Sequence, residues 1–193
     1  MQLNNPSSLP KASVFIDAGH YHYNLFNKWR IDYKKLIQFL EGRGYVASFV
    51  FYYEGIPSKS SYFYTHPNET YDAFNQIKKK KKAYFRVLQS FNFIVRSKPV
   101  RRIFDKDLSQ YKLKCNFDVE LTMDVMDILL NKDIDVFVFC SGDGDFIRLL
   151  RRVKNQGKKT MVLGLKNCTN DELAEAAHDV IFLEAIKDKI EFK

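Results

Sequence analysis

The chain has 193 residues, a formal net charge of +8 and an isoelectric point near 9.3, and 46% of its residues are hydrophobic. This length and composition are typical of a single globular domain, 1–193, that buries a sizeable core. The positive charge favours a polyanionic partner over a cationic one, although solubility alone also explains a basic isoelectric point.

Cysteine spacing and hydropathy exclude further classes of protein. Cys115, Cys140 and Cys168 lie far apart without a CxxC or Cys/His pair, so neither a disulfide framework nor structural zinc is expected. Residues 1–11 are polar, lack the apolar core of a signal peptide and are expected to be flexible, and no apolar run reaches transmembrane length. We therefore expect a cytoplasmic protein that makes no membrane contact.

Hydrophobic periodicity in the first half of the chain predicts alternating strands and helices. The expected elements are a strand at 13–17, a helix at 31–40, a strand at 45–53, a loop at 56–68 and a helix at 71–90. The segments 91–95 and 100–104 are expected to be two strands or a hairpin. A polar and mobile segment, 105–114, should follow them.

The second half of the chain continues the alternation. The expected elements are a helix at 117–130, a strand at 136–140, a helix at 146–153, a strand at 159–165, a helix at 171–177 capped by Thr169 or Asn170, a strand at 180–183 and a C-terminal tail at 184–193. The segment 136–140 is wholly apolar, which is typical of a strand buried on both faces of a parallel sheet. Strands that alternate with helices predict an α/β fold with a mostly parallel, doubly wound sheet.

Aspartates lie where these elements end or begin. Asp17 ends the first strand, Asp143 and Asp145 follow the apolar strand, and Asp118 opens a helix that carries Asp124 one and a half turns later. Ligands of open α/β sheets bind beyond the carboxyl ends of the strands, so we expect these side chains near one another. Two unit charges about 5 Å apart repel by roughly 3 kcal/mol at an effective dielectric constant of about 20. Such a cluster must shift its pKa values or bind a cation.

The donor atoms favour a hard metal ion. Oxygen ligands suit Mg²⁺ or Mn²⁺, and zinc is disfavoured without sets of His and Cys nearby. Such an ion can polarise a phosphate and generate hydroxide from water. Taken alone, any one of these aspartates is better explained as structural, with Asp143, Asp145 or Asp118 as a helix cap and Asp124 as a solvated helix residue. The set of aspartates favours a metal site.

Three motifs, in order along nearly the whole chain, resemble those of the NYN domain, a branch of the PIN-like nucleases. They are Phe15-Ile-Asp17, Lys114-Cys-Asn-Phe-Asp-Val119 with Asp124, and Ser141-Gly-Asp-Gly-Asp-Phe146; the segment 157–164 also resembles the next strand of the family. The last of the three motifs is fairly specific, and the first is weak alone. His20 stands where the family usually has Asn.

The resemblance implies a PIN-like, Rossmann-like three-layer sandwich and a metal-dependent ribonuclease. It implies that Asp17, Asp118, Asp143 and Asp145 are catalytic metal ligands, with Asp124 in support, and that the cofactor is Mg²⁺ or Mn²⁺. The expected partner is RNA, single-stranded or structured, and a homodimer is left open. The residues expected to contact the substrate are His20, Asn24, Ser141, Arg148 and Lys114.

Basic and aromatic residues carry weaker information. Arg148 lies one helical turn beyond Asp145, from where it can approach the scissile phosphate, but helix solubility explains it equally well. The run 78–82 is all lysine and is better explained as a solvated helix face than as a contact to the RNA backbone. The aromatic run 20–23 suits either base stacking or packing beneath a helix.

Three functions are compatible with these residues. The leading hypothesis is a Mg²⁺- or Mn²⁺-dependent (endo)ribonuclease that acts through the aspartate cluster. The alternative is a catalytically weak or inactive nucleic-acid-binding or regulatory protein with a residual metal site, which His20 motivates. A phosphohydrolase of small molecules ranks last, because no Asp-x-Asp follows the first strand. A dinucleotide-binding fold is excluded, since no Gly-x-Gly-x-x-Gly follows that strand.

Overall fold

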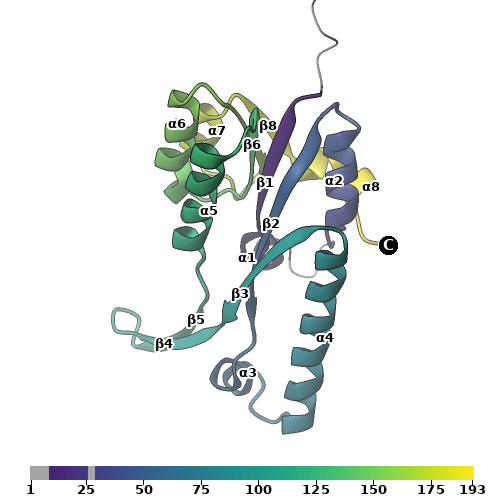
Figure 1. The fold of residues 1–193 in the computed structure, drawn as a ribbon. Coiled ribbons are helices and arrows are strands. Elements are labelled where there is room, and N and C mark those ends of the chain that lie inside the picture. Colours follow the sequence, from purple (N-terminus) through teal and green to yellow (C-terminus); the bar gives the residue numbers. More distant parts are fainter. Residues whose placement is uncertain (1–8, 26–28) are drawn as a thin grey trace, which may run out of the picture.

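A computed structural model describes residues 9–25 and 29–193, except for the side chains of Tyr23 and Asn24 (Figure 1). Its described part contains a six-stranded sheet, all parallel, in the order β3-β2-β1-β6-β7-β8. The strands are β1 (Lys11–Asp17), β2 (Val46–Ile56), β3 (Phe93–Pro99), β6 (Val136–Cys140), β7 (Lys159–Gly164) and β8 (Asp179–Phe182). A separate antiparallel hairpin consists of β4 (Arg101–Asp105) and β5 (Gln110–Lys114).

Helices cover both faces of the main sheet. They are α1 (Ala18–Asn24), α2 (Tyr33–Glu41), α3 (Lys59–Thr65), α4 (Tyr71–Ser90), α5 (Asp118–Asn131), α6 (Ile147–Asn155), α7 (Asp171–Ala176) and α8 (Lys187–Ile190), with single 3₁₀ turns at η1 (Gly144–Phe146) and η2 (Leu183–Ile186). Figure 1 shows α5, α6 and α7 on one face and α2, α4 and α8 on the other. Within the described residues, no helix has the length and apolar character that a membrane span requires. The predicted doubly wound α/β fold is confirmed.

The order of the strands creates a switch point between β1 and β6. From β1 the chain winds outward through β2 to β3, and it then returns to the other side of β1 and winds outward through β6, β7 and β8. In the register of the central pair, Ile16 lies opposite Cys140. Open α/β sheets bind their ligands at such a point, at the carboxyl ends of the strands. The carboxyl ends of β1 and β6 therefore mark the expected site.

Two apolar cores result from the alternation of side chains along the central strands. Val14 and Ile16 of β1 point to the core beneath α2 and α8, whereas Phe15 points to the core beneath α5 and α6. The ring of Phe15 stacks on that of Phe51 with the centroids 5.2 Å apart. Since both faces of the sheet are covered, β6 is buried along its whole length, as its apolar sequence predicts.

Two helices lie where the sequence did not predict them. α3 occupies part of the segment 56–68, which was expected to be a loop. It forms because Ser58 and Ser61 make a capping box, in which each side chain binds the backbone of the other residue, and because Tyr62 is buried. α1 begins directly after β1, and the side chain of Asp17 caps it.

The prediction for 91–114 was wrong in its boundaries. β3 runs through 96–99 and pairs with β2 in the main sheet, so these residues are not the turn of a hairpin. The hairpin lies further on, where β4 pairs with β5, and 105–114 is an ordered turn and strand. The turn forms because the Asp105 carboxylate accepts hydrogen bonds from the backbone of Asp107 and Leu108 and pairs with Lys112.

The two ends of the chain also differ from expectation. β1 already begins at Lys11, and residues 1–8 of the expected flexible segment lie outside the described part. The expected tail at 184–193 contains most of η2 and all of α8, and Ile186 and Ile190 are buried in the core. Of the two predicted caps of α7, Asn170 is the one that binds, accepting from Leu173 N at 3.1 Å.

Candidate active site

Asp17 is held at the carboxyl end of β1 by two hydrogen bonds. Its Oδ1 accepts from the backbone N of His20 at 3.2 Å, because Asp17 caps α1. Its Oδ2 accepts from Ser141 Oγ at 3.3 Å, directly after β6. The sequence predicted Asp17 at a strand end, and the structure joins it to the end of the neighbouring strand.

Asp143 lies in the turn that follows β6. Its backbone N donates to Ser141 Oγ at 3.3 Å, and its Oδ1 accepts from the backbone N of Asp145 at 2.9 Å, so that it caps η1. Gly142 is needed in this turn because a Cβ there would lie 2.8 Å from Thr169 Cα and even closer to Cys168 O. The turn therefore packs directly on the backbone of the segment before α7.

Asp118 is the first residue of α5, where the positive end of the helix dipole favours a carboxylate. Asn116 fixes its position. The Asn116 Oδ1 accepts from Asp118 N at 2.9 Å, and the Asn116 Nδ2 donates to the Asp118 carboxylate. Sequence reasoning did not single out Asn116. The Asn-x-Asp spacing before a helix, which is typical of an Asx turn, would have indicated it.

The three aspartates meet at one cavity of about 260 Å³. Its lining residues come from the end of β1, the start of α1, the segment before α5 and the turn after β6. They are Asp17, Gly19, His20, Cys115, Asn116, Phe117, Asp118 and Asp143. Asp145 is exposed and is not among the described residues that line the cavity. Three of the four predicted ligands are thus brought together.

The pKa values in the cavity reflect burial and crowding of like charge. Burial raises the pKa of Asp17, and the charge of Asp118 adds to this, although hydrogen bonds from His20 and Ser141 oppose it. Burial also raises the pKa of Asp118, and the charges of Asp143 and Asp145 raise it further. Burial lowers the pKa of His20 against the opposing charges of Asp17 and Asp143. The carboxylates therefore repel one another electrostatically across the cavity.

The donor set of this cavity suits a hard divalent cation. Its three carboxylates and one amide offer oxygen atoms, and their mutual repulsion would be relieved by a positive ion. In the part of the chain that the structure describes, no three His, Cys, Asp or Glu side chains are already arranged so as to hold a metal ion together. Small movements of the side chains would be needed to bring three carboxylates onto one ion.

Asp124 is engaged elsewhere. Its Oδ2 accepts from Tyr53 OH at 2.9 Å and from Arg96 Nε at 3.0 Å, and its Oδ1 accepts from Arg96 Nη2 at 2.7 Å. It is not among the described residues that line the cavity. Asp124 joins α5 to β2 and β3, so any support that it gives to the site is through the position of α5.

The residues predicted to contact substrate lie at different depths. Ser141 is buried behind Asp17 and Asp143, and His20 lines the cavity. Arg148 is exposed on α6. Lys114, at the end of β5, lines a second cavity, and its charge opposes the rise in the pKa of Asp118. Asn24 is the last residue of α1, and its side chain lies outside the described part.

Comparisons with known proteins found two sequence relatives and a solved structure with a similar fold. The low amplitude and bright protein LabA of Synechococcus elongatus is 23% identical over 183 residues, which cover 94% of this chain and 88% of LabA. An uncharacterized protein of Methanocaldococcus jannaschii, MJ0482, is 33% identical over 64 residues, or 33% of this chain and 27% of that protein. The crystal structure of VPA0982, a protein of unknown function from Vibrio parahaemolyticus, has a TM-score of 0.70 and 22% identity over 100% of both chains.

The family comparison extends over almost the whole described structure. The family model of the NYN domain matches residues 11–184, from the first residue of β1 to beyond the end of β8. The match includes every aspartate that lines the cavity. The chain therefore belongs to the NYN domain family of PIN-like nucleases.

Proposed function

We propose that this protein is a Mg²⁺- or Mn²⁺-dependent ribonuclease that hydrolyses RNA phosphodiester bonds at the aspartate cavity. One observation carries the proposal. Asp17, Asp118 and Asp143 come from three distant segments and line a single cavity at the switch point of the sheet. Three ionised carboxylates so close together repel one another unless a cation lies between them. A metal-dependent phosphodiesterase needs such carboxylates to hold its metal ion.

The residues have distinct parts in this proposal. Asp17, Asp118 and Asp143 would hold the ion, with Asp145 beside them. When bound, the ion would supply polarisation of the phosphate and activation of a water molecule. Ser141 and Asn116 orient Asp17 and Asp118 through hydrogen bonds. We propose Lys114, which lines the adjoining cavity, and Arg148, which is exposed on α6, for contacts to the RNA backbone. Hydrolysis adds water across one P–O ester bond and leaves a phosphate monoester on one fragment and a hydroxyl on the other.

Cleavage of labelled single-stranded and hairpin RNAs, with Mn²⁺, Mg²⁺ or EDTA, tests the proposal. We expect cleavage that EDTA abolishes and that Asp143→Asn reduces by at least roughly 100-fold, since one metal ligand is lost. The matched control is Asp127→Asn, which makes the same change of charge at an exposed position of α5. Cleavage by Asp143→Asn at the rate of the control would refute the assignment. Circular dichroism spectra confirm that both variants are folded.

A second candidate is an RNA-binding protein that retains the metal site without turnover. His20 favours it, because this side chain lines the cavity where the family usually has Asn. This candidate predicts binding of RNA with a steep salt dependence and no cleavage at any concentration of divalent ion. The His20→Asn variant separates the two. Cleavage gained only in this variant would support the second candidate, whereas cleavage by the unaltered protein supports the first.

A further inference from the structure

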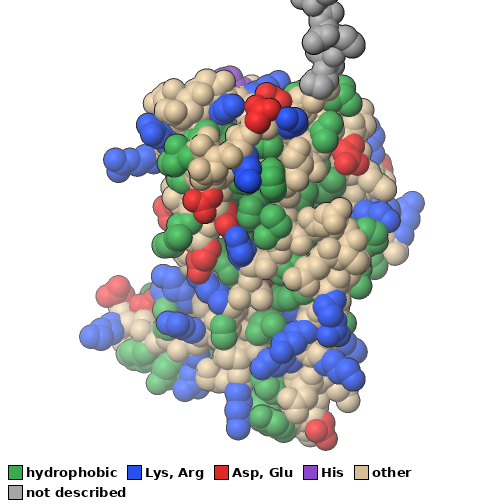
Figure 2. All heavy atoms as spheres, viewed as in Figure 1, with side chains coloured by type: hydrophobic (Ala, Val, Ile, Leu, Met, Phe, Trp, Pro, Cys, Tyr) green, Lys and Arg blue, Asp and Glu red, His purple; other side chains and the backbone are tan. Residues whose placement is uncertain are grey.

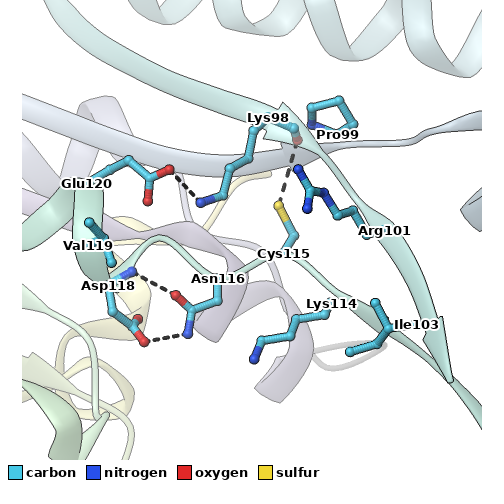
Figure 3. Close-up of a pocket in the computed structure, with 10 residues that line it drawn as sticks. All are labelled: Lys98, Pro99, Arg101, Ile103, Lys114, Cys115, Asn116, Asp118, Val119 and Glu120. Carbon is cyan, nitrogen blue, oxygen red and sulfur yellow. Dashed lines mark hydrogen bonds and ion pairs between the residues drawn. The ribbon is translucent and has the colours of Figure 1, made fainter. Parts of the chain in front are cut away.

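A larger cavity, of about 610 Å³, adjoins the aspartate cavity. It lies between the end of β3, the hairpin β4–β5 and the start of α5 (Figure 3). Cys115, Asn116 and Asp118 line both cavities, so the two lie side by side. Ligand sites in proteins typically measure about 300–1,000 Å³, and this hairpin cavity has room for part of an extended substrate.

Two cations lie on the same face of the hairpin. Arg101 and Lys114 are direct partners in the antiparallel ladder, so their side chains lie on the same face, and both line the hairpin cavity. Like charges at such a position destabilise a hairpin. Among the residues that the structure describes, no carboxylate forms an ion pair with either of them, whereas nearby Lys98 pairs with Glu120 at 2.5 Å. Both side chains are exposed, and the charge of Lys114 also acts on Asp118, so the two cations are available to an anionic ligand in the cavity.

The opposite face of the hairpin is fixed to α3. Tyr64 OH donates to Tyr111 O at 2.8 Å. The guanidinium of Arg102 lies 5.5 Å from the ring of Tyr64 and 4.3 Å from that of Tyr111, in cation–π geometry. The aromatic face is therefore used for packing. Since side chains alternate along a strand, this packing directs Arg101 and Lys114 to the other face, toward the cavity.

The base of the hairpin is equally constrained. A Cβ on Gly55 would lie 2.7 Å from Val100 Cγ2 and 2.9 Å from Cys115 Sγ, so β2 packs closely against both ends of the hairpin. Figure 2 shows Lys and Arg side chains gathered at this end of the molecule. The backbone that carries the two cations is therefore held in place and is not a free arm.

We infer that Arg101 and Lys114 clamp one backbone phosphate of the RNA strand next to the scissile phosphate, and that the strand passes from the aspartate cavity through the hairpin cavity. The identity of this ligand as RNA rests on the proposed function. A phosphate between the two side chains pairs with both charges, and Arg offers two parallel donors to phosphate oxygens. Phosphate contacts carry no sequence information, so this subsite fixes the position of the strand and not the choice of base.

Binding of a fluorescent single-stranded RNA, measured by anisotropy over a range of salt concentrations, tests the clamp. The measurement uses Asp143→Asn as the parent, so that cleavage does not interfere. We expect Arg101→Ala/Lys114→Ala to weaken binding by about 10-fold and to make the slope of log K against log salt shallower by about 0.7, the contribution of one phosphate contact. The exchange Arg101→Lys/Lys114→Arg keeps both charges and should retain most of the affinity.

The matched control is Arg43→Ala/Lys132→Ala. It removes one exposed Arg and one exposed Lys that precede β2 and β6. Both therefore lie at the amino ends of the strands, away from the carboxyl ends that form the site. Equal affinity and slope in the clamp variant and in this control would overturn the clamp, whether or not the protein cleaves RNA. If the unaltered protein binds RNA through the clamp without cleaving it, the ribonuclease proposal fails and the clamp stands. An absence of RNA binding overturns both.

Discussion

Ser141 Oγ donates a hydrogen bond to Asp17 Oδ2 at 3.3 Å and so joins the ends of β6 and β1, which are 124 positions apart in the chain. The same oxygen accepts from the backbone N of Asp143 at 3.3 Å. Ser141 is only 1% exposed, so water does not compete for these bonds. One buried hydroxyl therefore sets the distance between two of the three carboxylates in the cavity.

Replacing Ser141 by Ala should impair cleavage more than folding. Both hydrogen bonds are lost, and we expect the free energy of unfolding to fall by about 1–2 kcal/mol and kcat to fall roughly 10- to 100-fold, as for groups that orient metal ligands. Thermal unfolding and steady-state kinetics measure the two effects. Ser48→Ala, at an exposed serine of β2, is the control. An unchanged kcat in Ser141→Ala would show that the hydroxyl does not position the site.

Replacing Gly142 by Ala should displace the turn that carries Asp143. The added methyl would lie 2.8 Å from Thr169 Cα, and because its neighbours are backbone atoms, the turn itself must move. We expect a loss of about 1–3 kcal/mol in the free energy of unfolding, as for other overpacked positions, together with a large loss of cleavage. Urea unfolding and RNA cleavage are the measurements.

Gly157→Asn is the control for that variant. Gly157 has a φ of +75° and nothing within 4 Å of an added Cβ, and Asn tolerates such a φ better than most residues. This variant should keep its activity and nearly all its stability. If Gly142→Ala behaves in the same way, the turn has room to adjust, and the tight packing is not required.

Asp124→Asn should impair folding more than cleavage, which is the reverse of the effect expected for Ser141→Ala. Asp124 is 7% exposed and receives three hydrogen bonds from Arg96 and Tyr53, so the variant leaves the Arg96 charge without its partner. We expect the free energy of unfolding to fall by about 2–3 kcal/mol. The folded fraction should still cleave RNA within roughly 10-fold of the normal rate, because Asp124 does not touch the cavity. Loss of cleavage as large as in Asp143→Asn would contradict this view.

Glu54 should contribute to stability in a pH-dependent way. Burial raises its pKa, but the hydrogen bond and charge of His22 and the charge of Lys81 outweigh burial and hold the pKa below its ordinary value of 4.5. Since the folded state binds this proton less tightly than the unfolded state, the stabilisation is fully present above about pH 4.5 and is lost as the pH falls through the lowered pKa.

The Glu54→Gln variant tests that linkage. At pH 7 it should be less stable than the unaltered protein by on the order of 2 kcal/mol, because Lys81 loses its buried partner. The difference between the two proteins should shrink as the pH is lowered below 4.5. Urea unfolding at a series of pH values measures it. A difference that is constant with pH would show that the pKa of Glu54 is the same in the folded and unfolded states.

Much of the central sheet could be predicted because its strands carry strong patterns. The uninterrupted apolar run of β6 and the alternation of strands and helices determine the fold class, and Asp17 and Asp143 follow from where those strands end. The sequence does not show which strands are neighbours. Asp17 and Ser141 are in contact because the chain returns to β1 after β3 and places β6 beside it. This order of strands is determined by long-range packing.

The elements that were not predicted depend on local polar contacts. α3 depends on a serine capping box, and the turn of the hairpin depends on the Asp105 carboxylate, neither of which produces hydrophobic periodicity. Asp124 has the spacing of a supporting ligand. Its partner Arg96 is 28 positions away in the chain, so their ion pair exists only in the folded state and cannot be predicted from spacing. Lys81, expected on a solvated face, is likewise paired with the buried Glu54. Partners of charged side chains are decided by tertiary structure.

The position of β1 between β2 and β6 has a consequence during synthesis of the chain. β2 and β3 follow β1 early and can pair with it while the ribosome is still translating, but β6 and the Asp143 turn emerge much later. Until then one edge of β1 has no partner strand and Asp17 has no Ser141 to hold it. A nascent or truncated chain that ends before β6 therefore carries no assembled cavity, and the cavity is complete only once the second half of the sheet has closed on the first.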